Sequence, residues 1–274
     1  MTPAYLAHFE LREPPFSKEL SDADLWLPSS KLSLVDELCE ALHQRASVSL
    51  VGEPGVGKTC VLRALRQRLP QAGFRLTYCH NATLGRRDFY RQLCLALGLT
   101  PSATAAAVFY SVATHVEQLG QERLHPVFLL DEAHLLHQDV LDHLHILLNY
   151  QWDSKALLSL VLVGLPDLDH RLSRRHHRSL YSRLHTRLRI DPLTPEDTAE
   201  YLRVRLSRAG CQRELFASDA LAMLHEAACG ALRDIDRLAT SALREAARRK
   251  KKLVERDVLA RLLDAEPSNS AERS

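Results

Sequence analysis

Short apolar segments alternate along the chain with longer segments whose apolar residues recur at helical spacing. Four apolar segments predict buried strands, and they cover residues 47–51, 74–79, 127–131 and 159–163. A weaker fifth covers residues 188–191. Because helical segments separate these strands, the pattern predicts an α/β fold with a five-stranded parallel sheet covered by helices.

The pattern becomes entirely helical after residue 191. Thr194, Pro195 and Asp197 form a helix start with a capping box, and Gly210 suits a helix end. Further helices are predicted over 219–228, 232–248 and 255–263, and an earlier one over 32–44. We therefore expect an N-terminal extension at 1–46, an α/β core at 47–191, a small all-helical domain at 192–264 and a disordered tail at 265–274.

Residues 52–59 read Gly-Glu-Pro-Gly-Val-Gly-Lys-Thr and lie between a predicted strand and a helix at 60–69. This is the context that a P-loop needs, because its glycines let backbone N–H groups point at phosphate oxygens. Lys58 is expected to reach the β- and γ-phosphates, and the Thr59 hydroxyl to bind Mg²⁺. The predicted contacts to ATP come from Gly52, Glu53, Pro54, Gly55, Val56, Gly57, Lys58, Thr59 and Cys60.

Two carboxylates follow the apolar residues 127–130. Asp131 is expected to hold Mg²⁺, directly or through water. Glu132 is placed to polarise an attacking water. A metabolic kinase takes its acceptor from the substrate and does not need this glutamate, so the pair favours ATP hydrolysis.

Four further segments resemble the ExeA/TniB-like group of AAA+ ATPases, which includes general secretion pathway protein A and the ATPase helpers of transposition. They are residues 5–9 with Pro15 and Phe16, residues 81–84 with Tyr90 and Leu93, residues 162–168, and residues 230–238. The resemblance covers nearly the whole chain. It implies that the helical domain is an AAA+ lid and that subunits assemble into a ring or filament with ATP at their interfaces.

The resemblance also implies roles for three arginines, and the chain departs from the family pattern at one position. Arg183 matches an arginine finger that acts on a neighbouring subunit, with Arg187 one turn later as the alternative. Arg233 matches the lid's sensor arginine. Leu165 stands where the group usually carries a polar sensor of the γ-phosphate, which implies slow hydrolysis or a substitute such as His134.

The net charge of +2 says little about partners, but basic residues are clustered. Arg86 and Arg87 are candidates for DNA binding because they follow the second strand, where related initiator-type ATPases line a DNA-holding pore. Residues 171–190 and 248–252 are also rich in basic residues, which fits phosphate backbones, solvated faces or contacts between elements. His134 and His137 allow a metal site, although a polar helix face explains them as well.

These observations leave two functions and argue against a third. The first is a DNA-bound helper ATPase of transposition, with duplex DNA, a transposase and other copies of the chain as partners. The second is an ATPase that drives assembly of a secretion complex. The third, a metabolic kinase, is disfavoured by Glu132 and by the lid with Arg233. Scattered cysteines, with neither a signal peptide nor a long apolar segment, predict a cytoplasmic protein that does not enter a membrane.

Overall fold

The computed structural model describes residues 3–79, 83–102, 104–151 and 154–265. It divides into two compact units. The helical unit comprises Met1–Pro28, Pro54–Gly57 and Asp191–Ser274, and the α/β unit comprises Ser29–Glu53 and Lys58–Ile190. Of the expected tail at 265–274, Ala265 is the last residue of a helix, and residues 266–274 lie outside the described residues.

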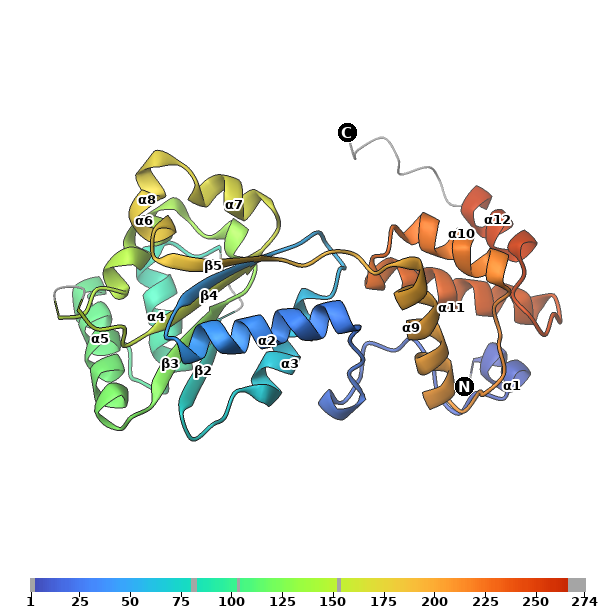
Figure 1. Cartoon of the computed structure of the whole chain (residues 1–274), viewed down its shortest axis with the longest axis horizontal. Helices are drawn as coiled ribbons and strands as arrows, with labels where there is room; N and C mark the ends of the chain where they lie inside the picture. The colour runs from blue at the N-terminus through green and yellow to red at the C-terminus, as the bar shows by residue number, and fades with distance from the viewer. Residues whose placement is uncertain (1–2, 80–82, 103, 152–153, 266–274) are drawn as a thin grey trace. The chain divides into compact units, whose positions relative to one another are not determined.

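Five parallel strands form the sheet of the α/β unit, in the order β2-β3-β4-β1-β5 (Figure 1). β1, β3 and β4 are buried along their whole length, which explains why their sequences are largely apolar rather than alternating. The predicted α/β fold with a five-stranded parallel sheet is therefore confirmed. The strands are β1 (Ser47–Val51), β2 (Phe74–Cys79), β3 (His125–Leu130), β4 (Ser159–Gly164) and β5 (Leu184–Arg189).

Two strand predictions were wrong at their starts. β5 begins at Leu184 rather than at residue 188, and it lies at the edge of the sheet, where only Leu184 and Leu188 are buried. Its other residues are polar, so the strand has little apolar signal. β3 begins at His125 rather than at residue 127, because His125 already pairs with Phe74 of β2. The buried His125 imidazole shares a 2.8 Å hydrogen bond with Ser159 Oγ.

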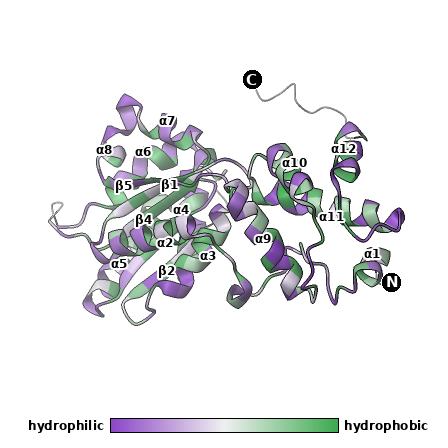
Figure 2. Ribbon diagram, turned by 45° about the vertical axis from the view of Figure 1, so that its right-hand side comes forward, coloured by the Kyte–Doolittle hydropathy of each residue, from purple (hydrophilic) through white to green (hydrophobic). Residues whose placement is uncertain are grey.

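The helices of the α/β unit bury one face and expose the other, and Figure 2 shows hydrophobic and hydrophilic residues alternating around them. α2 and α3 lie side by side (Figure 1), and α4 packs on α5 and α6. The helices are α2 (Ser29–His43), α3 (Lys58–Arg68), α4 (Arg86–Ala96), α5 (Ala105–Gln121), α6 (Gln138–Leu147), α7 (Asp167–Leu172) and α8 (Arg178–Tyr181), with 3₁₀ turns η2 (Ala133–Leu135) and η3 (Arg175–His177).

The helical unit is built around α11, whose apolar positions from Ile235 to Ala246 are buried. Its α9 starts at the predicted capping box, in which Thr194 and Asp197 each bond the other's backbone N–H. The unit contains α1 (Ala4–Phe9), η1 (Asp22–Asp24), α9 (Pro195–Arg208), α10 (Ser218–Ala228), α11 (Leu232–Arg248) and α12 (Arg256–Ala265). No helix among the described residues is long and apolar enough to cross a membrane.

The first residues of the chain pack into the helical unit, so the expected extension 1–46 is not one element. Arg205, which is only 4% exposed, donates to the carbonyls of Pro15 and Ser17 at 2.7 Å each and to the Tyr201 hydroxyl at 2.8 Å. The Tyr201 hydroxyl in turn donates to Asp236. This buried network fixes residues up to Pro28 in the helical unit, whereas α2 packs on α3 and β1 in the α/β unit.

Candidate nucleotide-binding site

The predicted P-loop follows β1 directly. Its first residue, Gly52, donates its N–H to Gly164 O at the end of β4, at 3.1 Å. Gly55 and Gly57 have φ values of +79° and +99°, which favour glycine because a Cβ is strained there. α3 starts at Lys58, so the backbone N–H groups at the helix start are available to an anion.

Lys58 is 9% exposed, and its ammonium group is held inside the loop. Nζ donates to Gly52 O at 2.8 Å and to Glu53 O at 3.0 Å. Thr59 is exposed in the first turn of α3, and Cys60 is half-buried beside it. The loop therefore presents an ammonium and a hydroxyl on consecutive residues, as phosphate and Mg²⁺ binding require.

Asp131 follows β3 and is only 8% exposed. Its Oδ2 accepts a 2.8 Å hydrogen bond from the Tyr78 hydroxyl, and its Oδ1 accepts a 2.9 Å bond from Glu132 N–H. Each oxygen keeps a second lone pair for a cation or a cation-bound water. The two hydrogen bonds fix the orientation of the Asp131 carboxylate.

No sequence motif predicts that Tyr78 belongs to this site. It pairs with Leu129 in the β2–β3 register, so its ring lies beside the end of β3. Burial raises the pKa of Tyr78, and the hydrogen bond to Asp131 and the negative charges of Asp131 and Glu132 raise it further. The phenol therefore stays protonated and acts as a donor to Asp131.

Glu132 adopts a left-handed conformation, with φ of 53° and ψ of 35°. This conformation is uncommon for a residue with a side chain, and such residues concentrate at functional sites. Its carboxylate is half exposed, and Oε2 lies 3.6 Å from Nδ1 of His134. The Glu132 carboxylate is therefore accessible to water, as a general base must be.

His134 lies between Glu132 and the expected sensor position. Its Nδ1 accepts from the Leu165 N–H at 3.4 Å, and its side chain is 11% exposed. An acceptor Nδ1 carries no proton, so its approach to Glu132 in this state is a close contact and not an ion pair. Arg171 supports the turn by donating to the carbonyls of His134 and Leu136.

Gly164 allows this close approach. A Cβ at that position would lie 3.1 Å from His134 N and 3.2 Å from its Nδ1. Glycine at the end of β4 therefore lets the η2 turn rest on the strand. Leu165, one residue further, is half-buried and contributes its backbone N–H to His134, not a polar side chain.

The two finger candidates differ in secondary structure, and the predicted spacing of one helical turn between them was wrong. Arg183 sits between α8 and β5, and its Nη1 donates to Ser179 O at 3.0 Å. Arg187 is in β5 and is not one helical turn later, because the chain is already extended from Leu184. Its guanidinium stacks 3.7 Å from the Tyr181 ring centre and donates to Tyr181 O. Arg187 is thus held within its own subunit.

Arg233 lies exposed in the first turn of α11, in the helical unit. Its backbone N–H donates to Gly55 O at 3.4 Å, and a Cβ on Gly55 would lie 3.2 Å from the Arg233 Cβ. The tip of the P-loop, Pro54–Gly57, belongs to this unit.

The basic segments lie on different elements. Arg86 and Arg87 are exposed in the first turn of α4, next to the positive end of the helix dipole. In the block at 248–252, Arg248 and Arg249 pair with Glu245, and Lys251 pairs with Glu255 and Asp257. That block joins α11 to α12. Residues 81 and 82, part of the segment before α4, lie outside the described residues.

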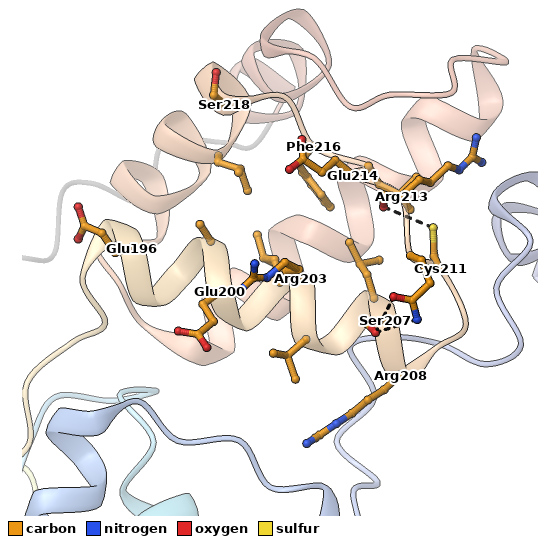
Figure 3. Close-up of a pocket in the computed structure, with 17 residues that line it drawn as sticks. Glu196, Glu200, Arg203, Ser207, Arg208, Cys211, Arg213, Glu214, Phe216 and Ser218 are labelled. Carbon is orange, nitrogen blue, oxygen red and sulfur yellow. Dashed lines mark hydrogen bonds between the residues drawn. The ribbon is translucent and has the colours of Figure 1, made fainter.

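His134 and His137, the pair that allowed a metal site, lie on different elements. His134 is in η2, and His137 caps α6 through a 3.4 Å bond from Asp139 N–H. A groove of about 900 Å³ in the helical unit contains none of the predicted site residues (Figure 3). It is lined by α9, α10 and the loop between them, where the charged groups Glu200, Arg203 and Glu214 surround apolar side chains.

One protein family and one curated relative match this sequence. The profile of the AAA domain family matches residues 28–172. General secretion pathway protein A of Aeromonas hydrophila is 33% identical over 258 residues, which are 93% of this chain and 47% of that protein. The chain thus spans about half the length of this curated relative.

Several solved structures share the fold. The Drosophila ORC bound to DNA superposes with a TM-score of 0.67 at 21% identity, over 95% of this chain and 65% of that one. Cdc6p from Pyrobaculum aerophilum gives a TM-score of 0.62 at 20% identity, over 88% and 67%. The RuvB branch migration motor of Thermotoga maritima gives 0.59 at 18%, over 92% and 73%.

Proposed function

Because this chain belongs to the AAA+ family of ATPases, we propose that it binds ATP with Mg²⁺ and hydrolyses it at interfaces between its own subunits. One series of contacts supports this most directly. Gly52 bonds to Gly164, the next residue Leu165 bonds to His134, and His134 contacts Glu132. The P-loop and the glutamate are thereby linked through the end of β4.

Each residue of the site has its own role in the proposed reaction. Lys58 and the loop N–H groups bind the phosphates, and Thr59 and Asp131 hold Mg²⁺. The cation, when bound, neutralises charge on the phosphate oxygens. Glu132 orients and deprotonates the attacking water. Arg183 of a neighbouring subunit and Arg233 stabilise charge on the transferred phosphoryl group.

We further propose that the assembled ATPase binds duplex DNA through Arg86 and Arg87 and serves as a transposition helper, selecting a target or activating a transposase. Both arginines are exposed on the first turn of α4, where the helix dipole adds to their positive potential. Two structural neighbours, the Drosophila ORC and the Aeropyrum pernix ORC1, were solved in complex with DNA.

ATP-dependent binding to duplex DNA, measured over a series of salt concentrations, tests this proposal. The Arg86→Ala/Arg87→Ala variant should bind DNA more weakly and lower the salt slope by about 2, since each phosphate contact contributes about 1. Its ATP affinity should not change. The matched control is Arg75→Ala/Lys155→Ala, which removes two exposed charges elsewhere in the α/β unit.

The second candidate is an ATPase that drives assembly of a secretion complex, and the similarity to general secretion pathway protein A favours it. For this alternative, we expect the chain to hydrolyse ATP at low salt without binding duplex DNA and without a change in rate when DNA is added. A chain that binds DNA only with ATP supports the transposition helper.

A further inference from the structure

Three potential metal ligands from two elements of the α/β unit converge beside α6. Asp142 lies on α6, and His176 and His177 are the last two residues of η3. One ligand atom from each residue lies within 4.8 Å of the other two. Asp142 Oδ1 and His177 Nδ1 are 3.2 Å apart. That distance is close to the edge of a tetrahedral site, about 3.3 Å for metal–ligand bonds of about 2.0 Å.

His177 gives the second observation. It is 2% exposed, yet its buried Nδ1 has no hydrogen-bond partner among the described residues. Asp142 Oδ1 is near enough but does not lie in line with an N–H bond. A buried polar atom without a partner destabilises the fold unless something binds it. A metal ion between His177 Nδ1 and Asp142 Oδ1 would bind both atoms. It needs no N–H bond directed from one atom to the other.

Gln138 can serve as the outer partner of such an ion. Its Nε2 lies 3.0 Å from His177 Nε2 and also donates to Asp142 Oδ1 at 3.0 Å. A turn of the amide by 180° places its carbonyl oxygen against the His177 Nε2–H. That turn fixes the tautomer in which Nδ1 is the ligand and releases the carboxylate oxygen for the metal.

We propose that Asp142, His176 and His177 bind one divalent transition-metal ion of the Zn²⁺ class, with water as the fourth ligand. Two imidazoles and a carboxylate suit Zn²⁺, and water in the fourth position completes a tetrahedron. The ion cross-links α6 to η3, from which the chain leads through α8 to Arg183. Arg171 and Arg174 are the nearby positive charges, and Arg171 is bonded to the carbonyls of His134 and Leu136.

Titration of the untagged full chain with Co²⁺, followed by visible absorption, tests the site without using ATPase activity. We expect one ion per chain with the strong visible bands of a four-coordinate site, displaced by one equivalent of Zn²⁺. Asp142→Asn and His176→Ala replace exposed residues, so neither removes buried packing. Each should weaken binding more than about 10-fold, because even outer partners of a ligand have effects of that size.

The matched control is His145→Ala/His170→Ala, which removes two histidines from the same unit but neither from the cluster nor from the cap of α6. It should bind Co²⁺ like the parent chain. Zn²⁺ should also raise the melting temperature of the parent and the control, but not of Asp142→Asn or His176→Ala. Unchanged Co²⁺ affinity in both ligand variants would overturn the proposal. So would a near-ultraviolet thiolate band, which would place the ion on a cysteine.

Discussion

The hydroxyl of Tyr78 donates a 2.8 Å hydrogen bond to Oδ2 of Asp131, and so a side chain of β2 orients the carboxylate at the end of β3. The β2–β3 register makes this possible, because Tyr78 lies opposite Leu129, two residues before Asp131. A carboxylate that holds Mg²⁺ depends on such a partner for its orientation.

Removal of that hydroxyl should weaken Mg²⁺ binding. We expect Tyr78→Phe to lower the Mg²⁺ affinity of the ATP-bound chain about 10-fold, because partners of a metal ligand have effects of this order. ATP binding without Mg²⁺ should not change. Titration calorimetry with and without Mg²⁺ measures both. Tyr110→Phe, on an exposed tyrosine of α5, is the control. Equal Mg²⁺ affinities in Tyr78→Phe and the parent would show that Asp131 is oriented by Glu132 N–H alone.

Glu132 can be tested separately from nucleotide binding. Glu132→Gln keeps the size and the backbone conformation but removes the base, so ATP turnover should fall by about 10²- to 10⁴-fold with ATP affinity retained. Phosphate release and binding of a fluorescent ATP analogue measure the two quantities. Glu122→Gln, at the exposed end of α5, is the control. Substantial turnover in Glu132→Gln would show that another residue acts as the general base.

His134 and Leu165 give opposite expectations. His134→Ala removes the acceptor of the Leu165 N–H and so loosens the turn that positions Glu132, and we expect a kcat about 10-fold lower with little change in KM. His134→Gln keeps an acceptor for Leu165 N–H and should recover part of that loss. Leu165→Gln supplies the polar side chain that the position lacks, and a faster turnover is expected. A Leu165→Gln chain that turns over no faster than the parent would argue against a sensor defect.

The sequence predicted the elements that depend on local chemistry. The P-loop, the acidic pair and the capping box of α9 each follow from neighbouring residues, and the alternation of strands and helices predicted the parallel sheet. The contacts of Tyr78 and His134 could not be predicted in the same way. They depend on the register of β2 against β3 and on the close approach that Gly164 allows, and both relate residues about 30 to 50 positions apart. The start of the edge strand β5 was predicted wrongly because most of its residues are polar, so that no apolar pattern marks the strand.

Complementation between two inactive variants tests whether Arg183 acts on a neighbouring subunit. Arg183→Ala should be inactive because it lacks the finger, and Lys58→Ala because it does not hold the phosphates. A mixture should regain activity, since a Lys58→Ala subunit offers Arg183 to the intact P-loop of its neighbour. Arg178→Ala, an exposed arginine of α8, should remain active alone. A mixture as inactive as its components would place the arginine in its own subunit.

The stability of the chain should depend on pH through Asp236. Burial raises the pKa of this carboxyl to about 6, and the Tyr201 hydrogen bond, Arg205 and Lys18 oppose burial without reversing it. Because the folded pKa lies above the unfolded value of 3.8, the stabilisation is complete below pH 3.8 and is lost as the pH rises through about 6. Asp236→Asn removes that dependence, and its amide oxygen can still accept from Tyr201.

The expected difference is measurable by urea unfolding. Between pH 4 and pH 7 the parent should lose up to about 3 kcal/mol relative to Asp236→Asn, since a pKa unit corresponds to about 1.4 kcal/mol. The control is Asp234→Asn, whose carboxylate pairs with Arg237 on the same helix and whose side chain is about one-third exposed. It should follow the parent across the pH range. Parallel curves for the parent and Asp236→Asn would mean that Arg205 and Tyr201 compensate fully for the burial of Asp236.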